Sequence, residues 1–335
     1  MGTGLVGASI GLAARERLGA TVVGVDLDPA PALAVGALDA AGTLEEALDG
    51  AQAAFVAVPI PALARVTKDV LAVAGSGCVV TDVGSVKSAL VAAVADERFV
   101  GGHPLAGAES GGAAAARSDL FDGATWYLTP TQGTSGIGLE ALHGLLSALG
   151  ARPAVIDAEA HDRAMAFVSH LPHVLANVLV ELALEDGAVP ATGPSFRDAT
   201  RVAGANPQLW AGIYEGNRTA LMHAIEHAIA GLFAVRKRLE DRVPLDEWQA
   251  EAGRRNDLLR AAAAGGELAE LHVAVPNRPG VIADIALTLA REGINIADMS
   301  LAPSVDMATG SLDLSVPAEH EARAHELLAA LGLGA

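Results

Sequence analysis

The fold of this chain is decided by a glycine-rich run near its start, Gly2-Thr3-Gly4-Leu5-Val6-Gly7. The run matches the pattern G-x-G-x-x-G, and Ser9-Ile10-Gly11 continues it into a segment that is typical of a helix. Glycines at these places permit a tight turn and a close approach of backbone amides to a pyrophosphate, and a helix N-terminus adds a favourable dipole. We therefore predict a dinucleotide site formed by Gly2, Gly4, Leu5, Val6 and Gly7.

An acidic residue follows this run at the spacing that a dinucleotide-binding unit requires. The apolar stretch 21–25 predicts a strand, and Asp26 ends it about 20 residues after the glycines. A carboxylate at this place can hydrogen-bond a ribose diol and repels a 2′-phosphate, which favours NAD over NADP. The alternative is that Asp26 only begins a turn. With the glycine run upstream, we predict that Asp26 binds the cofactor ribose.

The first half of the chain alternates between strand-like and helix-like segments. Strands are expected at 21–26, 53–58, 78–81, 125–128 and 154–156, and helices at 61–74 and 85–95. Such alternation is typical of a doubly wound parallel sheet with helices on both faces. We predict an α/β dinucleotide-binding domain over residues 1–156.

The second part of the chain, residues 157–264, shows no strand pattern and is predicted to be an all-helical domain. Asp157 can cap a helix that runs to residue 186. Asn206-Pro207 places a cap before a proline at the first helical position, which predicts a helix to about residue 240. A further helix is expected over 246–264.

The third part, residues 268–332, is predicted to be a small α+β module. Strands are expected at 268–275, 294–301 and 311–316, and helices at 279–292 and 318–331. The order is βαββα. The short run 263–266 before it is rich in alanine and glycine and predicts a linker.

Composition narrows the classes of partner. The chain of 335 residues carries 22 basic and 40 acidic residues, a net charge of −18, which repels nucleic acid and anionic membranes. No apolar run is expected to span a membrane, and no export leader opens the chain. The single cysteine, Cys78, excludes an internal disulfide and a cysteine zinc cluster, and no metal site is predicted. These features favour a cytoplasmic protein.

The position of the first residue raises a separate expectation. Met1 stands directly before Gly2, where a dinucleotide-binding domain normally has a strand. In the strand order 3-2-1-4-5-6 that strand lies at the centre of the sheet. We expect this strand to be missing, and we hypothesise a true start about five or more residues upstream, in an apolar run.

Four further segments concentrate polar side chains. They are Asp82-Val83-Gly84-Ser85-Val86-Lys87, the glycine-rich stretch 101–111 with one histidine, Ser169-His170-Leu171-Pro172-His173, and Phe196-Arg197-Asp198-Ala199-Thr200-Arg201. We interpret 101–111 as a loop. The third segment places two histidines on one helix face, and in the fourth an acid precedes an arginine by three residues, close enough to orient its guanidinium.

With these segments the chain resembles the prephenate/arogenate dehydrogenases. The patterns D-x-G-S-x-K, G-H-P-x-A-G, S-H-L-P-H and D-x-T-R occur in the order and spacing of that family across almost all of residues 1–260. The resemblance implies a Rossmann domain, a helical domain that forms homodimers, and NAD as cofactor. It also implies a reaction, the oxidative decarboxylation of prephenate to 4-hydroxyphenylpyruvate in tyrosine biosynthesis.

The resemblance further implies roles for single residues. His103 matches the catalytic histidine that accepts the substrate hydroxyl proton, and Ser85 matches a serine that hydrogen-bonds the same hydroxyl. Arg201 and His173 match residues that bind the substrate, with Asp198 holding the arginine. His170 is either a second substrate-binding histidine or a packed core residue. His161, His223 and His227 lie on predicted helices and receive no role.

Residues 268–332 resemble an ACT domain, through the βαββα order, the loop Asn277-Arg278-Pro279-Gly280 and the run Gly293-Ile294-Asn295-Ile296. This resemblance implies that an aromatic amino acid binds the module and regulates the enzyme. The alternative is a module that only dimerises.

Two rival functions stay open. Arogenate carries an ammonium where prephenate carries a keto group, and Glu109 in the histidine stretch could favour that ammonium. An arogenate dehydrogenase would make tyrosine directly. The second rival is a catalytically weak regulator that binds amino acids, against which the set Ser85, His103, His173 and Arg201 argues.

Overall fold

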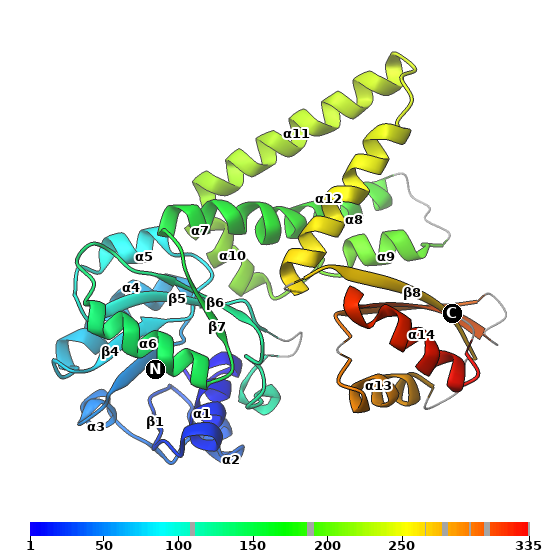
Figure 1. The fold of residues 1–335 in the computed structure, drawn as a ribbon. Coiled ribbons are helices and arrows are strands. Elements are labelled where there is room, and N and C mark those ends of the chain that lie inside the picture. The colour runs from blue at the N-terminus through cyan, green and yellow to red at the C-terminus, as the bar shows by residue number, and fades with distance from the viewer. Residues whose placement is uncertain are drawn as a thin grey trace. The chain divides into compact units, whose positions relative to one another are not determined.

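The computed structural model describes residues 1–107, 111–185, 191–264, 266–276, 281–294, 296–304 and 309–333. The chain forms two compact units, Met1–Ala230 and Gly231–Ala335. The first contains the α/β sheet and the helices packed on it, and the second contains the small α+β module (Figure 1). The predicted fold class is confirmed in its three parts: a doubly wound sheet, a helical segment and a βαββα module.

The first unit is built on a five-stranded sheet of order β3-β4-β5-β6-β7. Its strands are β3 (Ala53–Val56), β4 (Val79–Asp82), β5 (Phe99–Pro104), β6 (Thr125–Thr129) and β7 (Arg152–Val155). Neighbours run parallel except β5 and β6, which pair antiparallel. Only a short 3-10 turn, η1 (Ala113–Ala115), is described between β5 and β6, where a parallel pair would usually be joined by a helix.

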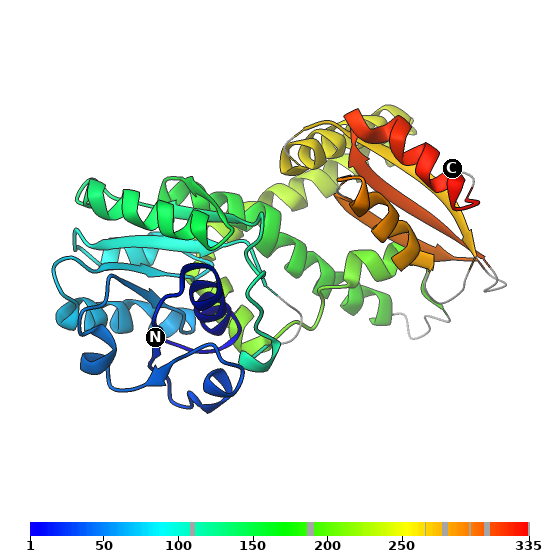
Figure 2. The same ribbon diagram turned by 60° about the horizontal axis from the view of Figure 1, so that its bottom comes forward.

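Helices cover both faces of this sheet, as the alternation of strands and helices predicted. Val79 of β4 packs in a cluster with side chains of α1 (Leu5–Leu18) and α6 (Gly136–Ala148). Its neighbour Val80 faces the other way, toward side chains of α4 (Ile60–Val73) and α5 (Ser88–Ala93). The two views in Figures 1 and 2 show these helices on opposite sides of the strands.

A second, two-stranded parallel sheet lies beside β3 and consists of β1 (Val23–Gly24) and β2 (Ala40–Ala41). The short helices α2 (Ala30–Ala34) and α3 (Leu44–Leu48) connect the strands of this region. The backbone of Met1 and Gly2 lies between the two sheets. Ala57 donates its N–H to Met1 O at 2.7 Å, and Gly2 donates to Val25 O at 2.9 Å. These bonds place the glycine run at the carboxyl ends of β1 and β3.

The helical segment follows β7. It consists of α7 (Ala158–Met165), a π-helical turn η2 (Ala166–His170), α8 (Leu171–Glu185), α9 (Pro194–Thr200), α10 (Pro207–Gly216), α11 (Arg218–Glu240) and α12 (Asp246–Ala264). Asp157 caps α7 by accepting the Ala160 N–H, and Asn206 caps α10 by accepting the Leu209 N–H. Both caps were predicted. The expected single helix from 207 to 240 is wrong, because the chain breaks it at Asn217.

The helical run Ala158–Glu185 is long and apolar enough to cross a membrane, judged by length and composition. The expectation that no apolar run reaches this length is therefore wrong. In the structure the first part of this run, α7, contacts β6 and α5 of the α/β domain, and the run carries three buried polar side chains, His161, Asp162 and His170.

The second unit contains a three-stranded antiparallel sheet of order β8-β10-β9. Its elements are β8 (Leu268–Pro276), α13 (Val281–Arg291), β9 (Asp298–Pro303), β10 (Thr309–Pro317), η3 (Ala318–His320) and α14 (Glu321–Ala330). Alternate residues of β8 face a core that contains Leu271, Val273, Ile285, Leu312 and Leu328. The predicted loop 277–280 and Asn295 lie outside the described residues.

Arg260 of α12 reaches the exposed face of this small sheet. Its guanidinium contacts Glu270, Asp298 at 2.9 Å and the Ser315 hydroxyl at 2.8 Å. These residues line a cavity of about 210 Å³. The contacts attach the end of α12 to the module that follows it.

Candidate active site

The glycine run forms a tight turn that leads into α1. Gly2 has a φ of +79°, and a Cβ there would overlap the carbonyl oxygen of Ala57. A Cβ on Gly7 would overlap the carbonyl oxygen of Gly2. Only glycine therefore fits at either position.

Gly4 differs from these two glycines, because no atom lies within 4 Å of the place that its Cβ would occupy. It is the N-cap of α1, and no side chain caps this helix end. The first N–H groups of the helix, those of Leu5, Val6 and Gly7, have no partner within the helix. Open space in front of such amides suits a pyrophosphate, so the residues present fit a dinucleotide.

Asp26 lies at the carboxyl end of β1 and contacts the same turn. One of its oxygens accepts the Thr3 N–H at 2.5 Å and the Thr3 hydroxyl at 3.1 Å. The other accepts the Asp28 N–H at 3.2 Å. Partial burial alone would raise the pKa of Asp26, but the hydrogen bonds from Thr3, Asp28 and Leu27 outweigh it and lower that pKa. The carboxylate is therefore charged at neutral pH and tied to the glycine turn.

His103 lies near the carboxyl end of β5, and its side chain is buried. The expected loop at 101–104 is wrong, since these residues form a strand paired with β6. A Cβ on Gly102 would stand 2.5 Å from the carbonyl oxygen of Asp82, so this glycine marks a close backbone approach and not a loop. Glu109, the other site residue predicted in this stretch, lies outside the described residues.

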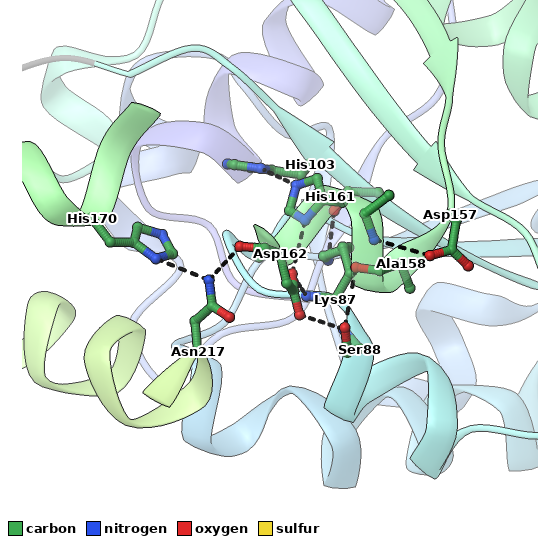
Figure 3. Close-up of polar contacts among 12 residues, drawn as sticks. Lys87, Ser88, His103, Asp157, Ala158, His161, Asp162, His170 and Asn217 are labelled. Carbon is green, nitrogen blue, oxygen red and sulfur yellow. Dashed lines mark hydrogen bonds and ion pairs between the residues drawn. The ribbon is translucent and has the colours of Figure 1, made fainter. Parts of the chain in front are cut away.

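A chain of hydrogen bonds connects His103 to a buried carboxylate (Figure 3). The His103 Nδ1 lies 2.9 Å from the His161 Nε2, and the His161 Nδ1 lies 2.9 Å from the Asp162 Oδ1. His161 is fully buried on α7, and its ring meets the His103 ring edge to face. We refer to Asp162, His161 and His103 as the relay.

The relay fixes where the protons lie when both rings are neutral. A carboxylate can only accept, so the His161 Nδ1 must donate to Asp162. The His161 Nε2 then carries a lone pair and accepts from the Nδ1–H of His103. It follows that the His103 Nε2 carries a lone pair, as a general base requires.

The charges around the relay keep His103 neutral. Burial lowers the pKa of His103 well below 6.5, and the Lys87 ammonium lowers it further, while Asp162 acts in the opposite direction. Burial alone would raise the pKa of Asp162, but hydrogen bonds from His161, Ser88 and Lys87 outweigh it and keep that pKa low. The site therefore contains an ionised carboxylate that orients a neutral histidine.

The segment 82–88 supports this arrangement. The Lys87 ammonium is fully buried, contacts the Asp82 carboxylate and donates to Gly102 O at 2.7 Å. The Lys87 and Ser88 backbone N–H groups each donate to Asp162 at 2.8 Å. Ser85 is half-buried, and no hydrogen bond joins it to His103 among the residues that the structure describes. The role predicted for Ser85 stays a prediction.

The two histidines of the third segment lie at the junction of η2 and α8. A π-helical turn in such a place is common at functional sites. The His173 ring stacks on Trp210, with ring centroids 3.5 Å apart. His170 is buried, and its Nδ1 lies 3.1 Å from the amide nitrogen of Asn217. The same amide nitrogen lies 2.7 Å from the backbone oxygen of Asp162, so His170 lies in the same cluster as the relay.

Arg201 directly follows α9, and both it and Asp198 are exposed. The Arg201 N–H donates to the Asp198 carbonyl at 3.4 Å. Burial lowers the pKa of His173, and the charge of Arg201 lowers it further, so the arginine lies near that ring. The side-chain pairing of Asp198 with Arg201 stays a prediction.

The sequence interpretation missed three residues of the cluster: His161, Asp162 and Asn217. One signal was available, since the pair His161-Asp162 is polar within a helical run that is otherwise largely apolar. The sequence around His161 and Asp162 does not reveal that His161 contacts His103, because His103 is 58 residues away in the chain.

Comparison with known proteins shows which family the chain is similar to. The chain matches family profiles for "Prephenate dehydrogenase, nucleotide-binding domain" over residues 10–155, "Prephenate dehydrogenase, dimerization domain" over 157–254 and "ACT domain" over 270–332. A prephenate dehydrogenase of Bacillus subtilis is 31% identical over 350 residues, which cover 97% of this chain and 93% of that protein.

Solved structures give the same result. The prephenate dehydrogenase of Aquifex aeolicus, in complex with hydroxyphenyl propionate and NAD+, is similar with a TM-score of 0.71 and 28% identity, over 76% of this chain and 95% of that one. An arogenate dehydrogenase of Synechocystis is similar with a TM-score of 0.67 and 28% identity, over 76% and 97% of the two chains.

Proposed function

The chain belongs to the prephenate dehydrogenase family, and we propose that it catalyses the NAD-dependent oxidative decarboxylation of prephenate to 4-hydroxyphenylpyruvate. The observation that carries the proposal is the relay, which presents a neutral His103 base at the carboxyl edge of the sheet. The glycine turn lies at the same edge, where α/β sheets bind their ligands. An oxidoreductase of this family needs both features.

Each predicted site residue has one role in this reaction. The glycine turn and Asp26 would hold NAD, which would supply the acceptor for the hydride of the hydroxyl-bearing carbon. The His103 Nε2 would take the hydroxyl proton, and the bond from the ring to its carboxylate breaks. Carbon dioxide leaves, the electron pair of that bond makes the ring aromatic, and His103 returns its proton to the resulting phenolate oxygen. Ser85 would hydrogen-bond the same hydroxyl. Arg201 and His173 would bind a substrate carboxylate, with Asp198 orienting the arginine.

An assay of the purified enzyme with NAD tests this proposal. Prephenate is expected to give 4-hydroxyphenylpyruvate together with NADH. The second candidate is arogenate, which is favoured by the likeness to the Synechocystis arogenate dehydrogenase. A higher kcat/KM with arogenate would make the enzyme a direct producer of tyrosine, and no NADH with either substrate would refute the proposed reaction.

Cofactor preference provides the first prediction on a single residue. The wild type is expected to have a higher kcat/KM with NAD than with NADP. Asp26→Asn is expected to narrow that preference by about tenfold or more. The substitution removes the repulsion between the Asp26 carboxylate and the 2′-phosphate of NADP, and like charges placed together cost several kcal/mol. Steady-state rates with both cofactors measure it.

Asp28→Asn is the matched control. Asp28 lies two residues after Asp26, and its exposed carboxylate accepts the Ala30 N–H. It should leave the preference unchanged. A wild type that uses NADP as well as NAD would contradict the role of Asp26.

We also propose that the enzyme is a cytoplasmic homodimer whose domains extend over 1–156, 157–264 and 268–332. The family profiles change at nearly the same residues and name the middle part a dimerization domain. Large apolar side chains of α8 and α11 are exposed, among them Leu175, Val178, Leu179, Leu182, Met222 and Ile229. Exposed apolar surface of this kind marks an interaction site.

The C-terminal module provides a prediction on regulation. Tyrosine or another aromatic amino acid is expected to bind residues 268–332 and to lower the activity of the full chain. The match of 270–332 to the ACT domain supports this. Calorimetry and inhibition assays on the full chain measure it, with alanine as the control ligand. A chain that shows neither heat nor a change in rate with tyrosine, phenylalanine or tryptophan has a purely structural module.

A further inference from the structure

We propose that Asn217 is a positioning residue that holds His170 with its proton on Nε2, so that His170 donates a hydrogen bond to an oxygen of the substrate. The donation to substrate rests on the proposed function. The position of the proton follows from the free protein alone.

Asn217 occupies the break between α10 and α11. Its backbone leaves the helical region, with φ −114° and ψ 27°, and its side chain is buried. The side-chain nitrogen lies 2.7 Å from the backbone oxygen of Asp162 and 3.1 Å from the His170 Nδ1 (Figure 3). One amide nitrogen therefore contacts two groups from η2 and α7.

The chemistry of these groups decides the direction of each bond. A backbone carbonyl can only accept, so the amide nitrogen and not the amide oxygen of Asn217 must face Asp162. An amide nitrogen carries two hydrogens and no free lone pair, so its second hydrogen points to the His170 Nδ1. The Nδ1 must accept, and in the neutral ring the proton lies on Nε2.

This assignment is opposite to that of His103. Through His161, the Asp162 carboxylate places a lone pair on the His103 Nε2. Through Asn217, the Asp162 carbonyl places a hydrogen on the His170 Nε2. A single residue thus orients one histidine as an acceptor of a proton and the other as a donor of a hydrogen bond.

The surroundings of His170 keep it a neutral donor. Among the described residues, the titratable groups that interact with it are Asp162, His161, His173 and His103. Burial lowers the pKa of His170 to about 4, although Asp162 acts in the opposite direction. Asn217 joins His170 to the backbone oxygen of Asp162, whose carboxylate begins the relay to His103, so the same residue anchors both histidines. The ligand group that fits is an oxygen acceptor, a carboxylate or a keto group, and not an ammonium.

Nitrogen-15 NMR of the free protein tests the proton position without any assay. The shifts of the two ring nitrogens separate a protonated from an unprotonated one, and the signal that disappears in His170→Asn assigns the residue. In the wild type, the Nε2 of His170 is expected to be protonated and its Nδ1 unprotonated. A proton on Nδ1 would overturn the proposal even if the enzyme oxidises prephenate.

Two variants test the consequence for catalysis. Asn217→Asp keeps the size of the side chain but can only accept when ionised, so it moves the His170 proton to Nδ1 and favours the charged ring. Asn217→Ala removes both bonds without imposing the opposite tautomer. We expect Asn217→Asp to lower kcat/KM by about 10- to 100-fold, mainly through KM, and more than Asn217→Ala.

The pH profile separates orientation from loss of fold. Asn217→Asp is expected to gain a titration in KM near the ordinary histidine pKa, which Asn217→Ala lacks. Equal effects of the two variants, with no new titration, would overturn the role of Asn217 in setting the tautomer. If neither variant folds, the wild-type NMR result still decides. If prephenate is not the substrate, the NMR result is unaffected, which distinguishes the two failures.

Discussion

Replacing His103 with alanine is expected to lower kcat by about 10²–10⁴-fold, the usual contribution of a positioned general base, while the Kd for NAD stays nearly unchanged. The reason lies in the relay, which supplies the His103 Nε2 lone pair and has no second group to replace it. The glycine turn and Asp26 are formed by other segments and stay intact. Steady-state kinetics and NAD titration of the variant measure the two quantities.

The pH dependence of the wild type gives a check on the same residue. Because the pKa of His103 is lowered well below 6.5, the base form persists across neutral pH and is lost only as the pH falls through that lowered value. The acid limb of kcat/KM should therefore lie below pH 6.5.

The matched control for His103→Ala is His143→Ala, which removes an exposed histidine on α6 and should behave as wild type. A loss of less than tenfold in His103→Ala would remove His103 from the mechanism.

Replacing Arg201 with alanine is expected to raise KM for the substrate by roughly 30- to 4,000-fold, with a much smaller change in kcat. Arg201 is exposed in the free protein, and we expect the bound substrate to bury its carboxylate against the guanidinium; truncating such a buried, charge-assisted pair costs about 2–5 kcal/mol. In a protein of net charge −18, a dianionic substrate depends on such local cations. The KM and kcat of the variant with each substrate measure the effect.

Two further variants show whether charge or shape matters at this position. Arg201→Lys keeps the charge but loses the planar fork, so it should recover only part of the affinity. Arg163→Ala removes an exposed arginine of α7 that pairs with Glu159, and should leave KM unchanged. If Arg201→Ala lowers kcat while KM stays constant, the arginine does not bind the substrate.

The sequence predicted those parts of the fold that depend on local patterns. The helix 246–264 agrees residue for residue, and the βαββα order of the last module follows from alternation with period two and the intervening helices. The caps Asp157 and Asn206 begin helices where predicted. Each of these features is determined by residues within a few positions of one another.

The errors arose where distant residues decide the local structure. The glycines at 101–102 suggested a loop, but Gly102 lets β5 pass close to Thr81 and Asp82 of β4, and Gly101 lies against Thr129 of β6. The helix expected through residue 240 breaks at Asn217, whose side chain bonds to His170, 47 residues earlier. His161 received no role because its partner lies 58 residues away. No local pattern contains these pairings.

The buried pair of Lys87 and Asp82 has a consequence for how the site opens. Its ammonium has no exposed surface, so separating it from Asp82 and Gly102 would leave charges in an apolar interior, and breaking a buried pair costs about 3–5 kcal/mol. The strand that carries His103 therefore cannot fray by itself. The backbone amides of Gly102, Lys87 and Ser88 donate to the carboxylates of Asp82 and Asp162. Their protons should exchange with solvent only when the whole unit unfolds. His103, the proposed base, therefore lies in the part of the first unit that we expect to unfold last.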